Sequence, residues 1–112
     1  MKRIEAFIRP AKLADVRAVL AELGLHRFTL SGVDGFGSEH IRTQFYRGVT
    51  YTVDCLPMAK LEVVVGDDQA LPLAHAIMDT AQTEGGDERV MIVPAEEIVR
   101  ARNNGRGTSA IG

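Results

Sequence analysis

The residues whose types and spacing suit chemistry are arginines and glycines, and the chemistry they suit is phosphate binding. Arg89 follows a turn that contains Gly86 and Asp87, and Arg100 and Arg102 stand two residues apart near the end of the chain. Guanidinium groups donate forked, charge-assisted hydrogen bonds to phosphate oxygens, and glycine lets backbone N–H groups approach them closely. A solvated final segment is the alternative for the arginines, since lone charge pairs usually lie at the surface.

A second pair of glycines opens the longest segment without a sustained apolar face, which runs from residue 34 to residue 57. Gly35 and Gly37 flank Phe36 at its start, where they suit either close backbone approach to a ligand or a tight turn after a strand. A loop this long inside a compact domain is usually functional or disordered. We therefore interpret this insert as the functional segment and the residues on either side of it as the structural scaffold.

The insert also contains residues that suit contact with a partner protein. Tyr46, Arg47 and Tyr51 are of the types enriched at interfaces, although tyrosines are also common as exposed residues of an extended hairpin. Three residues of metal-ligating type occur in it as well, Glu39, His40 and Asp54. In a loop, such residues are more often solvated than bound to a metal.

Length, charge and cysteine content narrow the class of protein. At 112 residues the chain is most simply one domain, which we place at residues 1–112. A net charge of -2 gives no general attraction to nucleic acid or anionic lipid, and the single Cys55 excludes an intramolecular disulfide. No apolar run approaches the ~20 residues of a membrane span. We expect a soluble, cytoplasmic protein that neither inserts into a membrane nor binds nucleic acid.

Apolar periodicity predicts strands and helices on both sides of the insert. Alternation with period two predicts strands at 2–9, 26–33, 59–65 and 90–93, and steps of three and four predict helices at 11–23 and about 67–82. Residues 95–101 fit either a short helix or an edge strand. The tail at about 103–112 has no periodicity, and we expect it to be mobile in the isolated chain.

Each predicted helix has an apolar face and recognisable ends. The face of the first is formed by Leu13, Val16, Leu20 and Leu23, with Gly24 as the stop signal. The face of the second is formed by Leu71, Ala74, Ile77, Met78 and Ala81, with Asp67 and Asp68 as the N-cap residues.

The order of these elements predicts the fold class. A chain that runs strand, helix, strand, insert, strand, helix, strand fits an α+β protein with the ferredoxin-like split βαβ sandwich, in which two helices cover one face of an antiparallel sheet. The long loop, at about 36–56, then connects strands two and three. Such a hairpin needs only about two to five residues, so the extra ones serve another purpose.

Short motifs along the chain keep the order and spacing of one known family. They are 2–10 and 13–23 at the start, Gly35-Phe36-Gly37, Tyr46-Arg47-Gly48 with Tyr51, Val53-Asp54 with Leu56-Pro57, the turn 83–89, and Arg100 with Arg102. The chain resembles, from end to end, the PII signal-transduction family of small trimeric regulators of nitrogen metabolism. The insert corresponds to that family's T-loop, and the turn 83–89 corresponds to its B-loop.

The resemblance implies a homotrimer that binds ATP or ADP in the clefts between subunits, with AMP and Mg²⁺ as further candidates. It also implies a mobile loop that docks on a membrane transporter or a metabolic enzyme. On the family's pattern, the adenosine side of the cleft would be formed by Thr29, Gly35, Phe36, Gly37 and Val64. The phosphates would be faced by Gly86, Asp87, Arg89, Arg100 and Arg102.

Departures from the pattern concern the groups that read 2-oxoglutarate and phosphate. Ser38 and Glu39 stand where the family has a glutamine, and Met58 replaces its lysine at the loop exit. A carboxylate repels a dicarboxylate and methionine offers no charge, so we expect 2-oxoglutarate sensing to be weak or absent. The turn before Arg89 is one residue shorter and carries Glu88, which we expect to weaken phosphate binding.

Two residues of the loop have a less favoured functional alternative. Tyr51 matches the tyrosine that some family members carry a nucleotidyl group on, but Val49 and Thr50 replace the usual small and acidic pair before it. Cys55 stands where the family has a large apolar residue, so a packed thiol is favoured over a redox sensor.

We do not expect an enzyme, because the sequence has no nucleophile elbow, Walker lysine motif or paired carboxylate on a fixed element. The function we expect is an adenine-nucleotide-sensing PII-type signalling regulator that controls a partner transporter or enzyme through its loop. A slow nucleotide hydrolase and a PII-like structural trimer without ligand sensing are the alternatives.

Overall fold

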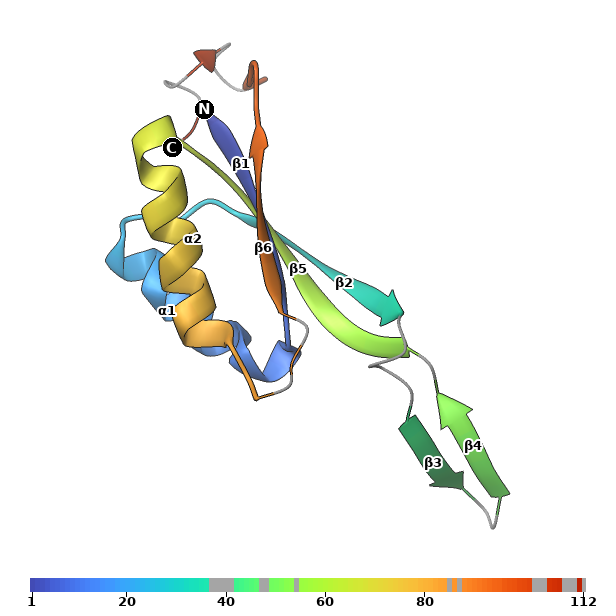
Figure 1. The fold of residues 1–112 in the computed structure, drawn as a ribbon. Helices are drawn as coiled ribbons and strands as arrows, with labels where there is room; N and C mark the ends of the chain where they lie inside the picture. The colour runs from blue at the N-terminus through green and yellow to red at the C-terminus, as the bar shows by residue number, and fades with distance from the viewer. Residues whose placement is uncertain are drawn as a thin grey trace.

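A four-stranded sheet forms the centre of the structure, which is a computed structural model of the chain (Figure 1). The structure describes residues 1–36, 42–46, 49–53, 55–84, 86, 88–101, 105–107 and 111, and for 42–46 and 49–53 it describes the backbone alone. In chain order the elements are β1 (Lys2–Ile8), the 3₁₀ turn η1 (Pro10–Lys12), α1 (Leu13–Glu22), β2 (Thr29–Phe36), β3 (Arg42–Tyr46), β4 (Val49–Val53), β5 (Cys55–Val65), α2 (Asp67–Ala81) and β6 (Arg89–Pro94).

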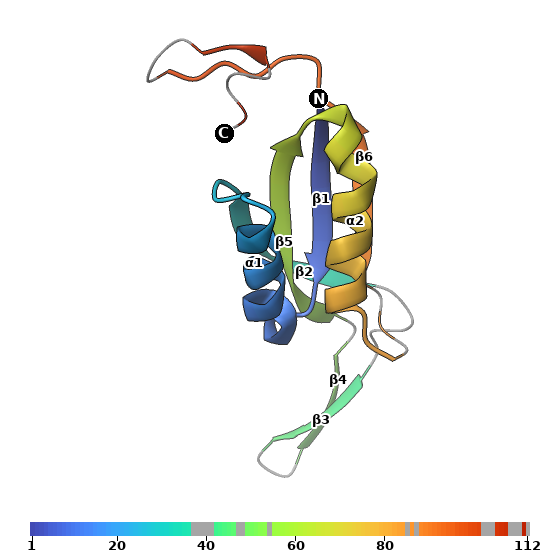
Figure 2. The same cartoon turned by 90° about the vertical axis from the view of Figure 1, so that its left-hand side faces the viewer.

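The strands of the main sheet are ordered β2-β5-β1-β6 and all neighbours are antiparallel. Helices α1 and α2 lie over one face of this sheet, and no described helix covers the other face (Figure 2). This is the ferredoxin-like split βαβ arrangement that the sequence predicts, and that prediction is confirmed. In chain order the insert lies between β2 and β5, so it connects the second and third strands of the main sheet.

The hydrophobic core lies between the two helices and the sheet. Alternate residues of β1 and β5 face the helices, and among them Ile4, Ile8 and Leu61 are fully buried. Helix α1 contributes Val16 and Leu20, which are also fully buried. Burying a side chain of this size stabilises the fold by roughly 1.5–3 kcal/mol, so this shared core holds the helices against the strands that lead to the insert.

The face of α2 that packs on the sheet agrees with the predicted face at Ile77 and Ala81 but differs from it in the first half of the helix. Its buried residues are Ala70, Leu73, Ile77 and Ala81. Leu71, which the periodicity places in the core, is instead 58% exposed. Ala70 with Leu73 and Leu71 with Ala74 are both pairs of one alanine and one leucine three residues apart, so periodicity alone does not choose between them. Within the described residues, no helix is long and apolar enough to span a membrane.

Helix α1 ends at the predicted glycine. Gly24 has a φ of 75°, and it donates its N–H to the carbonyl of Ala21 at 3.0 Å. Leu25 donates to the carbonyl of Leu20 at 2.9 Å, which completes the left-handed glycine motif that closes many helices. Leu23 was predicted on the apolar face but is 51% exposed, because it is the C-cap residue at which the chain leaves the helix.

Helix α2 begins with a different cap from the predicted one. Its N-cap residue is Gly66, and neither Asp67 nor Asp68 occupies that position. The side-chain oxygen of Gln69 accepts a hydrogen bond from the Gly66 N–H at 3.1 Å. Asp67 accepts one from the Met1 ammonium group at 2.7 Å, and this bond lowers the pKa of the Asp67 carboxyl. The first turn of α2 is thereby tied to the start of β1.

Strands β2 and β5 pair further into the insert than their predicted ends at residues 33 and 59. The ladder continues to the pair Phe36 and Cys55. Pro57 fits within β5 because pairing with β1 stops at Ile8 and Ala59, so β5 has no neighbour on that side at Pro57. A proline without an N–H is tolerated at such an edge. The sequence places the loop boundary early because aspartate, glycine and proline resemble turn residues.

Strands β3 and β4 form a separate two-stranded ribbon that projects beyond the end of β2 and β5 (Figure 1). Tyr46 is the last residue of β3 and pairs with Val49, and Tyr51 in β4 pairs with Gln44. The ribbon gives the chain an elongated shape, with principal extents of 57 × 28 × 22 Å. It carries two of the three residues predicted to contact a partner protein.

Residues 95–101 form neither a helix nor a regular strand, although both were predicted alternatives. They fold back along 105–107, and the Arg100 N–H donates to the carbonyl of Gly105 at 2.8 Å. Glu97 accepts hydrogen bonds from the Gly107 N–H at 2.8 Å and from Arg106 at 2.9 Å. These donors, Gly107 first and Arg106 second, lower the pKa of the Glu97 carboxyl. Of the tail predicted to be mobile, the structure describes only 105–107 and 111.

Candidate functional site: a basic pocket at the start of β2

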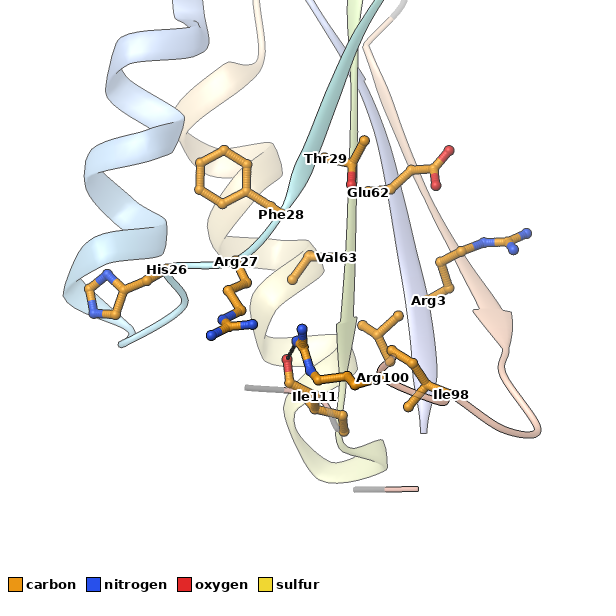
Figure 3. A pocket seen from close by; sticks show the side chains of 11 residues that line it. Arg3, His26, Arg27, Phe28, Thr29, Glu62, Val63, Ile98, Arg100 and Ile111 are labelled. Atoms are coloured by element: carbon orange, nitrogen blue, oxygen red, sulfur yellow. Dashed lines mark hydrogen bonds between the residues drawn. The ribbon is translucent and has the colours of Figure 1, made fainter. Parts of the chain in front are cut away.

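A pocket of about 490 Å³ lies where the start of β2 meets β5 and the C-terminal segment (Figure 3). Its lining comes from Arg3, residues 26–29, residues 62–64, Ile98, Arg100 and Ile111. Thr29, Val64 and Arg100, which the sequence analysis assigned to a nucleotide site, all line this pocket. The fold therefore brings together three candidate residues from distant parts of the sequence.

Two of the charged residues that line the pocket, Glu62 and Arg3, are paired with oppositely charged neighbours. Lys60 Nζ lies 2.8 Å from Glu62 Oε1, and Arg3 Nε lies 3.0 Å from Glu5 Oε1. The hydrogen bond from Lys60 lowers the pKa of Glu62, and the same bond raises the pKa of Lys60. Because Glu62 and Arg3 already have partners, the remaining charge of the lining comes from Arg27 and Arg100 and is positive.

The basic residues just before β2 were not predicted as part of a site. His26 and Arg27 lie in the strand predicted at 26–33 and were given no functional role, yet both line the pocket. Arg100 lines the same pocket from the C-terminal segment and donates to the backbone carbonyl of Ile111 at 3.4 Å. The available signal for Arg27 was its position two residues before Thr29, but an exposed arginine there looks like any solvated charge.

Other predicted binding residues lie away from this pocket in the same chain. Gly35 and Phe36 are at the far end of β2, roughly 20 Å along the strand from Thr29. Gly86 and Arg89 are beside and in β6, which is the opposite edge strand. Three strand spacings separate β2 from β6, or roughly 14 Å. The remaining predicted residues, Gly37, Arg47, Asp87 and Arg102, lie outside the residues that the structure describes.

Arg89 is positioned by an aromatic ring on the helix-free face of the sheet. Its guanidinium carbon lies 4.3 Å from the centre of the Phe7 ring, and Lys60 Nζ lies 5.9 Å from the same centre. Phe7 alternates with the core residues Ala6 and Ile8 along β1, so its ring is on the side of the sheet away from the helices. A cation over an aromatic face gains roughly 0.5–1 kcal/mol when exposed.

The turn before Arg89 is held by a buried carboxylate. Thr83 Oγ1 donates to Glu88 Oε1 at 2.6 Å, and Arg9 Nε lies 3.7 Å from the same oxygen. Only 3% of the Glu88 side chain is exposed. The Glu88 carboxylate is paired with Arg9 and serves as a hydrogen-bond acceptor inside the turn, while the effect of Glu88 on phosphate binding stays a prediction.

Gly86 lies in the closely packed part of this turn. Its N–H donates to the carbonyl of Thr83 at 3.1 Å. A Cβ atom at this position would overlap with the Thr83 hydroxyl and with the Glu88 carboxylate. A larger residue at this position would therefore have to displace the Thr83 and Glu88 side chains from their hydrogen bond.

The surroundings of Met58 and Cys55 bear on the roles that were predicted for these positions. Met58 is 3% exposed, so the position of the family's loop-exit lysine holds a buried apolar side chain. Cys55 is half-buried opposite Phe36, as expected for a packed thiol. The described residues contain no cluster of three potential metal ligands, and the suggested set Glu39, His40 and Asp54 lies outside them.

The ferredoxin-like sheet, the projecting ribbon and the basic pocket define a small α+β protein with a site suited to an anionic ligand. A sequence model of the family described as "Nitrogen regulatory protein P-II" matches residues 1–105. The protein named "Nitrogen regulatory protein P-II" from Pasteurella multocida is 43% identical over 112 residues, covering 99% of this chain and all of that protein. The "Nitrogen regulatory protein P-II 1" of Escherichia coli K12 is 41% identical with the same coverage.

The chain belongs to the nitrogen regulatory protein P-II family. The proteins that it matches along their full length are named as regulators, and a regulatory signalling role follows for this chain. The resemblance inferred from the short motifs is thereby confirmed.

Proposed function

We propose that the chain is an adenine-nucleotide-sensing regulator that assembles as a homotrimer in the cytoplasm and binds ATP or ADP between subunits. The observation that carries this proposal is the convergence of Thr29, Val64 and Arg100 on one pocket. Its apolar wall suits a base and ribose, and its arginines suit phosphate groups. AMP is a further candidate ligand, and Mg²⁺ is a candidate companion of the phosphates.

Assembly is supported by the separation of the two predicted halves of the site. Thr29 and Arg100 line the pocket, whereas Gly86 and Arg89 belong to the other edge of the same sheet. If both halves contact one nucleotide, the second half must come from another copy of the chain. A ring of copies that interact head to tail uses both edges once per interface, and a closed trimer satisfies this geometry.

Nucleotide titration of the purified protein tests this proposal directly. We expect ATP and ADP to bind in calorimetry, and light scattering to give the mass of a trimer. Arg100→Gln and Arg89→Gln should each weaken ATP binding by about tenfold or more, since a charge-assisted hydrogen bond contributes roughly 1.5–3 kcal/mol. Failure of the unaltered protein to bind any adenine nucleotide contradicts the proposal.

A mixing experiment tests whether the site is shared between chains. When Arg100→Gln and Arg89→Gln chains are co-refolded, random assembly gives about a quarter of the interfaces an intact pair of half-sites. Tight ATP binding should then reappear at that fraction of the sites. If both arginines acted within one chain, no mixed interface would be intact and the mixture would bind as weakly as its components.

The projecting ribbon is our proposed partner-docking element, with Tyr46, Arg47 and Tyr51 as contact residues for a transporter or metabolic enzyme. Cys55 is the single cysteine of the chain and lies at the end of the β2–β5 ladder. A fluorophore attached to it should report a change at the base of the loop on binding ATP and a different change on binding ADP. Equal spectra in both states count against a nucleotide-driven switch.

We further propose that 2-oxoglutarate has little effect on this protein. Met58 is buried and uncharged at the position where the family's lysine would meet the oxoacid. Addition of 2-oxoglutarate with Mg²⁺ should leave ATP affinity within about twofold of its starting value. A large increase in ATP affinity refutes this part of the proposal.

A further inference from the structure

We propose that Arg27 acts with Arg100 as a phosphate-binding residue of the pocket and that the two favour ligands with two or more phosphate groups. The inference rests on the proposed nucleotide-binding function and adds a specificity-determining residue to it. Arg27 is an exposed residue of the connection between α1 and β2, and Arg100 comes from the C-terminal segment. Both line the same pocket, and in Figure 3 their guanidinium groups point into the same part of it.

The backbone before Arg27 is held firmly by the end of α1. Gly24 takes the left-handed conformation, and Leu25 donates its N–H to the Leu20 carbonyl at 2.9 Å. Thr29 then begins the ladder with β5, so Arg27 is separated by one residue from fixed backbone on each side. A side chain that is anchored in this way loses less conformational freedom on binding a ligand than one on a free loop.

The charge of Arg27 is not balanced within the described part of the chain. Arg27 has no hydrogen bond or ion pair there, whereas Glu62 is paired with Lys60 and Glu5 with Arg3. Arg100 does have partners, including the carbonyl of Ile111 at 3.4 Å. That bond is longer than an ordinary N–H···O hydrogen bond, so a phosphate oxygen can replace it at little cost.

The two guanidinium groups suit a ligand with several negative charges. Each can donate a forked pair of hydrogen bonds, and an anion bound between two positive charges of one pocket reduces the repulsion between them. Phe28, Val63 and Ile98 supply an apolar wall beside them. A nucleoside with a di- or triphosphate matches both parts, since the wall accepts the nucleoside and the arginines accept the phosphates.

Charge-neutralising variants of the full-length protein separate this inference from the general function. Arg27→Gln is compared with Arg17→Gln, which removes the same charge from an exposed position of α1 that does not line the pocket. Calorimetry with adenosine, AMP, ADP, ATP and inorganic pyrophosphate gives the affinities, and circular dichroism checks that both variants fold. Arg27→Lys keeps the positive charge but removes the planar guanidinium group that can donate two parallel hydrogen bonds.

We expect Arg27→Gln to weaken ADP, ATP and pyrophosphate binding by about tenfold, with adenosine changed by less than about twofold. Arg17→Gln should bind every ligand like the unaltered protein, and Arg27→Lys should fall between the two. Unaltered ATP and ADP affinity in Arg27→Gln overturns the inference while nucleotide binding by the unaltered protein still stands. Equal losses in Arg27→Gln and Arg17→Gln also overturn it. If the unaltered protein binds neither ATP nor pyrophosphate, the inference and the proposed function both fail.

Discussion

Replacing Glu88 should destabilise the protein far more than replacing its exposed neighbour Glu84. The Glu88 carboxylate is 3% exposed, accepts a 2.6 Å hydrogen bond from Thr83 and lies 3.7 Å from Arg9. Removing one member of a buried ion pair costs about 3–5 kcal/mol. The Arg9 side chain is 39% exposed, so water replaces part of the lost interaction and the expected cost of Glu88→Ala is about 2–3 kcal/mol.

Thermal unfolding at fixed protein concentration measures this cost. A loss of about 2–3 kcal/mol lowers the melting temperature of a chain of this size by about 10 °C. Glu88→Gln retains an acceptor for Thr83 and should lose about half as much, while Glu84→Ala should stay within about 0.5 kcal/mol of the unaltered protein. If Glu88→Ala has the same melting temperature as Glu84→Ala, the Glu88 carboxylate does not stabilise the turn. Gly86→Ala adds a second check, because its cost should shrink in a Glu88→Ala background, where the overlapping carboxylate is gone.

Two further predictions concern glycine geometry and the C-terminal segment. Gly24→Ala should lower the free energy of unfolding, measured in urea, by about 1 kcal/mol, because the φ of 75° is strained for any other residue. Gly32→Ala, at an open position on the surface of β2, should leave the free energy of unfolding unchanged or raise it slightly. Equal effects of the two substitutions contradict this prediction. The pKa of Glu97 is lowered in the folded state, so its carboxylate stabilises the segment above the unfolded value of about 4.3 and this contribution is lost as pH falls through the lower folded value. Arg106→Gln should raise the pKa of Glu97 only part of the way, because the stronger donor, the backbone N–H of Gly107, remains; NMR titration of the side chain checks this, and an unchanged value contradicts it.

The order of the four main-sheet strands and the two α-helices was predictable because each has a clear apolar period, whereas strands β3 and β4 inside the insert were not predicted. The first half of the buried face of α2 was not predictable either, because two adjacent stripes contain the same residue types and only packing on the sheet selects Leu73 over Leu71. The end of β2 was also misjudged, because Asp34 and Gly35 favour a turn when considered alone. Their pairing with β5 is a long-range interaction that local preference does not report.

For the candidate site, Thr29, Val64 and Arg100 were predicted through the family resemblance, and the fold brings them together. Arg27 was not predicted, because nothing in the sequence distinguishes an arginine beside a pocket from one in solvent. The role of Glu88 was also beyond reach, since its hydrogen bond and ion pair join it to residues that sequence spacing does not connect. In both cases the missing information is the direction of a side chain.

Strand β2 connects the pocket to the base of the insert. It starts at Thr29 in the pocket and ends at Phe36, at the end of the sheet from which the ribbon projects, a run of roughly 24 Å without a break (Figure 1). Sliding against β5 by one residue would turn every side chain to the wrong face, so the two strands can bend or tilt together but cannot slip. A tilt of β2 at the pocket end would therefore change the direction in which the β2–β5 ladder leads into the insert. Because the ribbon projects beyond the end of this ladder (Figure 1), the same tilt would displace the ribbon further than the residue at which the motion starts.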